Sequence, residues 1–190
     1  MKFKTTLIEI ALSFALYWVF IAIQDLFPFL KNTHITYYVF LPAGVKLLTI
    51  LIFRWRGAIG VGLATFMRLD FAAPSHHWID WLYVATITTA ATFLVIELGL
   101  SFFKLDERLS NLKYCHLVIL AVITSIVNGF VFAKGLYMLV GNEMEGGLLH
   151  NSLLLIMGNF IGNAIFVCAL VLIMTQKKSI INFLKKNELI

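Results

Sequence analysis

The sequence predicts an all-α, polytopic integral membrane bundle of about six transmembrane helices, with both termini in the cytoplasm. Composition is the first observation: 61% of the residues are hydrophobic and only 13% are charged. A soluble domain has about half apolar and about a quarter charged residues. The other two observations are the length of the apolar runs and the placement of the basic residues between them. Strands of a β-barrel would be about half as long and would alternate in polarity.

Each expected span is an apolar run that approaches the ~20 residues a membrane helix needs. The first follows the basic start "MKFK" and has no signal-peptide cleavage site after it, so we expect it to remain as a mature helix. The third run is short and rich in glycine. We expect a transmembrane domain at residues 1–176 and a basic cytoplasmic tail at 177–190. The runs cover residues 7–23, 37–53, 57–67, 79–103, 115–140 and 148–175.

The basic residues lie mainly on one side of this predicted topology. The outer loops hold only Lys31 and Arg68, whereas Lys46 and Lys134 fall within spans. Basic loops stay in the cytoplasm, so this asymmetry predicts that both termini are inside and that the number of spans is even. The expected cytoplasmic residues are Lys2, Lys4, Arg54, Arg56, Lys104, Arg108, Lys113, Lys177, Lys178, Lys185 and Lys186.

Lys46 stands near the middle of the stretch "YYVFLPAGVKLLTILIFRWRG". A charge at the centre of a spanning helix costs about 2.5–3.5 kcal/mol, so it should face the bundle interior, paired or lining a wet cavity. We expect a ligand site with Pro42 and Gly44 one turn outward, joined by Lys134 and Asn159. A structural ion pair between Lys46 and Glu97 is the alternative.

The sixth run, "IMGNFIGNAIF", carries small and polar residues at helical spacing. Gly158 and Gly162 predict a close helix contact. Asn159 and Asn163 share one face, and hydrogen bonding between helices is their alternative role. Snorkelling is the alternative for Lys134.

The first run contains Ala11 and Ala15, a small-xxx-small face for another helix or another protein.

Other chemistry finds little support in the sequence. The net charge of +5 follows the topology rather than a nucleic-acid surface. The loop "PSHHWID" has imidazole and carboxylate groups but no convincing metal-ligand spacing. We find no catalytic triad, phosphate-binding loop or paired catalytic carboxylates. We therefore expect no catalytic activity, no metal and no cofactor.

Two stretches, "FLPAGVKLLTILIFRWRGAIGVGLATF" and "LLIMGNFIGNAIFVCALVLIM", resemble the membrane-associated sensor domains of bacteria, the MASE type. The family has a Pro-Ala-Gly in an early helix, which matches Pro42 to Gly44 here. It has a Gly-Asp at the start of its final helix, where this chain has Gly158 and Asn159. The resemblance implies a ligand-sensing bundle in a bacterial inner membrane, and we expect this chain to lack an output domain.

In layout the chain is similar to the substrate-binding S components of energy-coupling factor vitamin transporters. These are six-helix proteins of about this size, whose first helix carries small residues at AxxxA spacing for docking to a coupling subunit. Ala11 and Ala15 stand at that spacing. The resemblance implies a substrate-capturing subunit.

We therefore expect a sensor-like inner-membrane protein that binds a small anionic ligand or a partner helix. A transporter S component and a structural subunit of a larger membrane complex are the alternatives. Its expected partners are the lipid bilayer and another membrane or cytoplasmic protein, or a second copy of the chain, with no nucleic acid.

Overall fold

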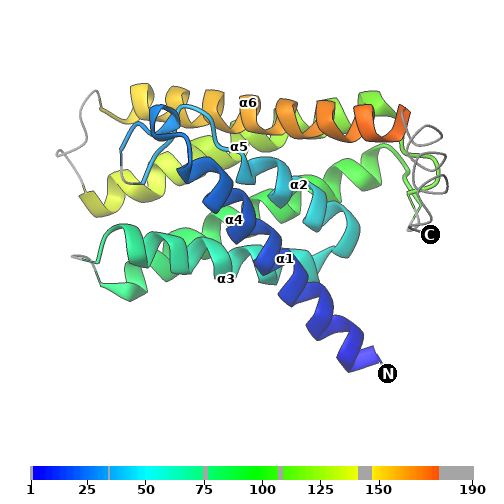
Figure 1. Ribbon diagram of the computed structural model, residues 1–190, viewed down its shortest axis with the longest axis horizontal. Helices are drawn as coiled ribbons and strands as arrows, with labels where there is room; N and C mark the ends of the chain where they lie inside the picture. Colours follow the sequence, from blue (N-terminus) through cyan, green and yellow to red (C-terminus); the bar gives the residue numbers. More distant parts are fainter. Residues whose placement is uncertain (1, 34, 75–76, 107–108, 141–146, 176–190) are drawn as a thin grey trace, which may run out of the picture.

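The computed structural model describes residues 2–33, 35–74, 77–106, 109–140 and 147–175. The predicted tail at 177–190 lies outside these residues. The described part is all-helical, as the sequence predicts, with six α-helices and one short 3₁₀ helix (Figure 1). The elements are α1 (Lys2–Asp25), η1 (Pro28–Leu30), α2 (Pro42–Phe53), α3 (Trp55–Ala72), α4 (Trp78–Phe102), α5 (Tyr114–Val140) and α6 (Gly147–Thr175).

Four of these helices are long and apolar enough to cross a membrane. They correspond to α1, α4, α5 and α6. The fifth apolar helix, α2, has only 12 residues. At 1.5 Å per residue it is about 18 Å long, well short of the ~30 Å hydrocarbon core. The structure thus supports a membrane protein, with four helices able to cross the bilayer and a short, apolar α2.

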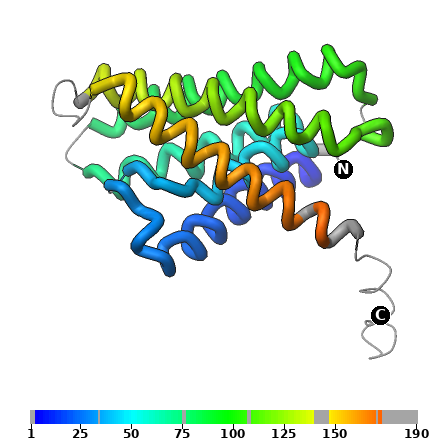
Figure 2. The backbone as a smooth tube through the Cα atoms, turned by 90° about the horizontal axis from the view of Figure 1, so that it is seen from above, coloured from blue at the N-terminus to red at the C-terminus, as the bar shows by residue number. Residues whose placement is uncertain are grey.

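The short helix α2 lies at the centre of the bundle. The other helices pack in chain order around it, with contacts between α3 and α4, α4 and α5, and α5 and α6, while α1 packs on α3. Contacts join α2 to every one of them, α1, α3, α4, α5 and α6. Figure 1 shows that α1 begins and α6 ends at the same end of the bundle, and Figure 2 shows α6 crossing in front of α2. A change in the position of α2 therefore affects every neighbouring helix.

The span expected at residues 37–53 is helical only from Pro42 onward. Pro42 takes the first helical position, where its missing N–H costs nothing, so it starts α2 instead of kinking a longer helix. The preceding backbone is irregular and is hydrogen-bonded by other elements. The side chain of Gln24 in α1 accepts from the Leu41 amide at 2.8 Å, and the Phe40 amide donates to the Gly158 carbonyl of α6 at 3.0 Å. Irregular backbone within a membrane bundle requires such internal partners.

Three apolar clusters surround the centre of the bundle. One joins α2, α4 and α5 around Ile50 and Ile96. A second joins α3, α4, α5 and α6 around Trp81, and a third joins α1 to α3 around Tyr17. Buried Lys46 and Arg68 interrupt this apolar interior.

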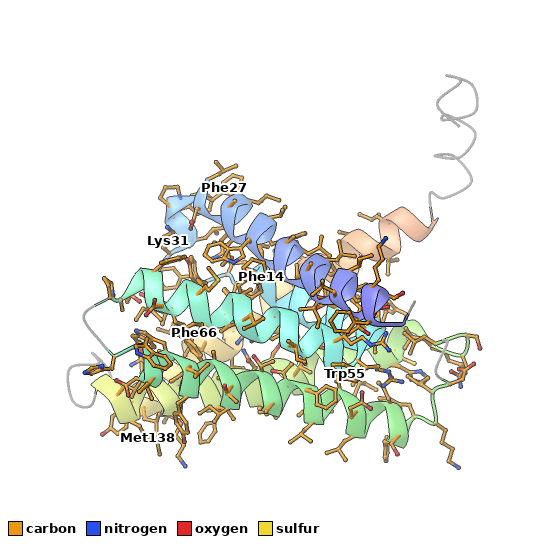
Figure 3. The ribbon with its side chains drawn as sticks, turned by 90° about the horizontal axis from the view of Figure 1, so that it is seen from below. Phe14, Phe27, Lys31, Trp55, Phe66 and Met138 are labelled. Carbon is orange, nitrogen blue, oxygen red and sulfur yellow. The ribbon has the colours of Figure 1, made fainter. Side chains whose placement is uncertain are left out.

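The α2–α3 turn carries its own ion pairs. Arg54 adopts a positive φ of 55° and bonds Glu97 of α4 at 3.1 Å, while Arg56 bonds Glu9 of α1 at 2.6 Å. The suggested pairing of Glu97 with Lys46 is therefore wrong, because Glu97 lies at this turn. Figure 3 shows Trp55 at the start of α3 and Phe66 further along the same helix, whereas Lys31 lies toward the opposite end of the bundle.

Candidate functional site

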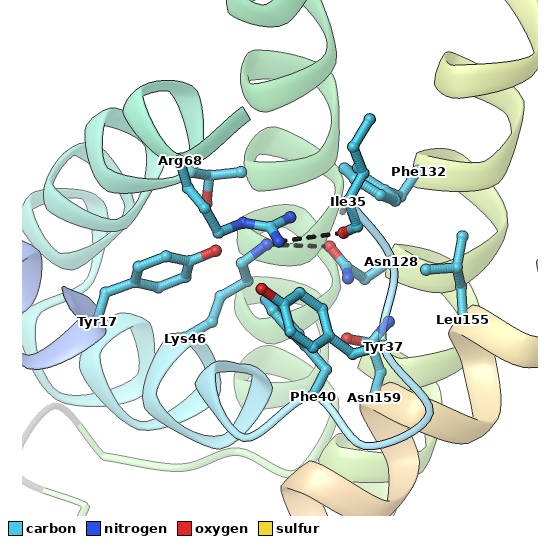
Figure 4. Close-up of a pocket in the computed structure, with 11 residues that line it drawn as sticks. Tyr17, Ile35, Tyr37, Phe40, Lys46, Arg68, Asn128, Phe132, Leu155 and Asn159 are labelled. Carbon is cyan, nitrogen blue, oxygen red and sulfur yellow. Dashed lines mark hydrogen bonds between the residues drawn. The ribbon is translucent and has the colours of Figure 1, made fainter. Parts of the chain in front are cut away.

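The candidate site is a mainly apolar cavity of about 20 Å³, with a few polar and charged side chains, beside the irregular segment that precedes α2 (Figure 4). Side chains from α1, α2, α3, α5 and α6 form its walls, together with residues of that segment. A neighbouring cavity of about 10 Å³ shares Lys46, Asn128 and Asn159 with it. The lining residues are Tyr17, Ile35, Tyr37, Phe40, Lys46, Thr65, Arg68, Asn128, Phe132, Leu155 and Asn159.

Lys46 enters the cavity from α2 and is 4% exposed. Its Nζ donates a hydrogen bond to Oδ1 of Asn128 on α5 at 3.2 Å. The same oxygen accepts from the Thr92 hydroxyl of α4, also at 3.2 Å. The Lys46 ammonium carries three donor hydrogens, but its one acceptor among the described residues is the neutral Asn128 oxygen, which also accepts from Thr92. Most of the ammonium charge is therefore uncompensated.

Arg68 enters the cavity from α3 and is 6% exposed. Its Nη1 donates to the Ile35 carbonyl at 3.1 Å. The guanidinium lies over the rings of Phe40 and Tyr37, at 5.1 and 5.7 Å from their centroids. These aromatic faces attract a cation and hold the planar group in place.

Arg68 is a site residue that the sequence analysis placed in an outer loop. The apolar run ends at Met67, but α3 continues to Ala72 and keeps Arg68 inside the bundle. The signal that could have found it is the buried stripe on α3. Gly57, Gly60, Val61, Ala64, Thr65, Arg68 and Leu69 follow one another at helical spacing and are all buried.

The two cations share a site without an acidic partner in the described part of the chain. Lys46 and Arg68 are close enough to repel each other, and Figure 4 shows both groups and the Tyr17 hydroxyl converging. The ion pairs of the described residues use other side chains, and no carboxylate lines the cavity. Burying an ion costs several kcal/mol unless an opposite charge or strong hydrogen bonds compensate it.

Several polar atoms around the cavity have no hydrogen-bond partner. They include the Tyr17 hydroxyl, Oγ1 of Thr65, Nε of Arg68 and Oδ1 of Asn159. All four side chains are buried and line the cavity. Buried polar groups are satisfied in the great majority of proteins, so such a cluster indicates a site that receives a further polar group.

The structure brings Lys46 and Asn159 together and leaves the other predicted ligand residues outside the cavity wall. Pro42 is buried at the start of α2. Gly44 faces α6, where an added Cβ would stand 2.2 Å from Cβ of Phe166. Lys134 is exposed on α5, which fits the alternative that its long stem reaches the membrane surface.

The small residues of α6 accommodate backbone rather than another helix. An added Cβ on Gly162 would lie 1.9 Å from the Phe40 carbonyl oxygen, and on Gly158 it would lie 2.6 Å from the Tyr37 oxygen. The predicted helix contact is thus replaced by a contact with the segment before α2. Asn163 does join helices, because its Nδ2 donates to the Ser125 hydroxyl of α5 at 2.9 Å.

The predicted partner face on α1 lies at the surface. Ala11 and Ala15 are both exposed. Among the described residues, no three His, Cys, Asp or Glu side chains lie together as a metal site.

Comparison with known proteins gives no match: no family model, curated protein or solved structure is significantly similar to this chain.

Proposed function

We propose that the chain is a multi-pass inner-membrane protein that binds an anionic group inside its helical bundle and has no catalytic activity of its own. The observation that carries this proposal is the pair of buried cations, Lys46 and Arg68, around a cavity with no carboxylate in its wall. An intramembrane cation of this kind is a binding-site hypothesis by default, because lipid does not compensate its charge.

The architecture around the cations supports binding. In membrane transporters, irregular backbone and broken helices form binding sites near the bilayer midplane. Here the segment before α2 supplies Ile35, Tyr37 and Phe40 to the cavity wall. A bound group that contacts both this segment and Lys46 would link the position of α2 to occupancy.

A sensor-like role follows from the position of α2. Its cavity end holds Lys46, and its other end is tied to α4 through the Arg54–Glu97 ion pair. Arg56 ties the adjacent turn to α1 through Glu9. A ligand-dependent shift of α2 would therefore reach a surface that faces the cytoplasm in the predicted topology, where a partner protein could detect it. This topology has six crossings, with both termini inside.

A transporter S component is the second candidate. The observation in its favour is the exposure of Ala11 and Ala15 on α1, since exposed small residues allow a second helix to approach closely. Co-purification with an ATPase module that is lost on Ala11→Leu, with ligand binding unchanged, would select this candidate over the sensor.

Lys46→Met tests the binding function. The substitution keeps the side-chain volume and removes a buried charge, so we expect the protein to insert and to be at least as stable as the wild type without ligand. Native mass spectrometry of gently extracted protein should show a bound anionic species in the wild type and none in the variant. Lys134→Met, a lysine outside the cavity, is the matched control and should keep the species. Equal occupancy in wild type and Lys46→Met would contradict the proposal.

A further inference from the structure

Four unmatched hydrogen-bond donors converge on the larger cavity. Lys46 has donor capacity beyond its one bond to Asn128, and Arg68 has an unpartnered Nε. The hydroxyls of Tyr17 and Thr65 are buried at 0% and 2% exposure and are also unpartnered. These residues come from α1, α2 and α3, so the donors surround the space from different helices.

An anion satisfies this arrangement better than water does. A water molecule could accept from two donors, but it would leave both positive charges uncompensated in the bundle interior. A monovalent anion accepts from the donors and also offsets the repulsion between Lys46 and Arg68, while a water beside it can donate to the unpartnered Oδ1 of Asn159.

The space limits the size of that anion. A cavity needs about 10–15 Å³ to hold one water molecule. The larger cavity offers about 20 Å³ and its neighbour about 10 Å³. This is room for one monatomic ion with one water beside it, so the narrow part of the site between the two cations favours a small inorganic anion.

The segment before α2 forms one wall of the cavity and is held in place by its neighbours. Phe40 bonds Gly158 through its amide, and Gly162 leaves no room for the Phe40 carbonyl to move toward α6. The rings of Phe40 and Tyr37 are held by Arg68 itself. A ligand that extended toward this side would have to displace the segment, whereas a small ion would not.

We infer that the cavity binds one halide-sized monovalent anion, held by Lys46, Arg68, Tyr17 and Thr65. The inference rests on the proposed binding function and specifies its ligand class as an inorganic halide rather than an organic acid.

The test uses purified full-length protein in lipid nanodiscs, in sodium gluconate at constant ionic strength. Replacing gluconate by chloride or bromide should raise the thermal unfolding midpoint saturably, because a ligand that binds only the folded state stabilises it. Sulfate should have no such effect. Tyr17→Phe and Thr65→Val should each raise the apparent chloride Kd about tenfold, since each removes one hydrogen bond to a charged group.

Thr88→Val is the matched control. Thr88 is fully buried, but its hydroxyl bonds the Val84 carbonyl of its own helix at 2.7 Å and does not line the cavity. Its chloride response should equal that of the wild type. Bromide-soaked crystals provide a second measurement, with an anomalous peak expected between Lys46 and Arg68.

The outcomes separate the two proposals. If formate or butyrate stabilises the protein through Lys46 while halides do not, the ligand is organic and the halide inference fails, but the binding function stands. If the cavity holds water alone and no anion stabilises the protein, both fail. A chloride effect that survives Tyr17→Phe, Thr65→Val and Lys46→Met alike would place the ion elsewhere and overturn the inference.

Discussion

Arg68 of α3 donates a hydrogen bond from Nη1 to the Ile35 carbonyl at 3.1 Å. This contact joins the end of a buried helical stripe to the irregular segment that precedes α2. It gives Arg68 two roles, since the same guanidinium supports the segment and supplies positive charge to the cavity. The stability of the segment and the binding of an anion should therefore be coupled.

Gly162→Ala should disrupt the segment before α2. The new Cβ would stand 1.9 Å from the backbone oxygen of Phe40, so the segment must move. We expect a loss of about 2–3 kcal/mol in unfolding free energy, typical of overpacking, and weaker anion binding. Unfolding in SDS titrations and ligand-induced stabilisation are the two measurements.

Gly62→Ala is the matched control for that substitution. Its added Cβ would meet Thr89 only at ordinary contact distance, 3.5 Å. Alanine favours a helix over glycine by up to about 1 kcal/mol, so stability should be unchanged or slightly higher. Equal effects of the two substitutions would show that Gly162 is not a contact point for the segment.

Asn163 and Ser125 should show a measurable coupling energy across α5 and α6. Their side chains are hydrogen-bonded at 2.9 Å and buried. Double-mutant cycles of such bonds in membranes average about 0.6 kcal/mol, so we expect a value near this for the two alanine substitutions. Ser152 is the control, because its hydroxyl bonds the Leu148 carbonyl of its own helix. The effects of Asn163→Ala and Ser152→Ala on the unfolding free energy should be additive. If the effects of Asn163→Ala and Ser125→Ala are additive as well, the hydrogen bond contributes nothing to stability.

The long spans were predictable from the sequence because each is a continuous apolar run of sufficient length. The start of α2 was not, since residues 37–41 are as apolar as the helix that follows. Their backbone is hydrogen-bonded by Gln24 and Gly158, which are remote in the chain, and no local pattern reveals those partners.

The direction in which a side chain points around its helix was not predictable from the sequence. The sequence placed Lys46, Lys134 and Asn159 within spans, but a side chain's neighbours depend on how the helices pack. Lys46 and Asn159 face the cavity, whereas Lys134 faces outward. Arg68 was missed because the apolar run was ended at the first charge, although the buried stripe of α3 continues through it.

Whether α2 and α3 cross the membrane or form a hairpin within it can be decided at Trp55. Helix α2 is about 18 Å long, and each extended residue before it adds about 3.3 Å. The helix and this segment together can therefore span the ~30 Å core. The arginines and tryptophan of the α2–α3 turn are residues that favour the headgroup region. Six crossings therefore place Trp55, which is half exposed, at the cytoplasmic surface.

We expect Trp55→Cys, in a background with Cys115→Ala and Cys168→Ala, to react with a membrane-impermeant maleimide from the cytoplasmic side only. Lys4→Cys is the control for the cytoplasmic side. Lys31→Cys, directly after η1, is the control for the outer side of the predicted topology. Labelling in inverted vesicles but not in spheroplasts would agree with six crossings. If Trp55→Cys reacts from neither side while both controls react as expected, the α2–α3 turn is buried and only α1, α4, α5 and α6 cross. The controls would be unaffected in that case, because a hairpin that enters from outside leaves the direction of every other helix unchanged.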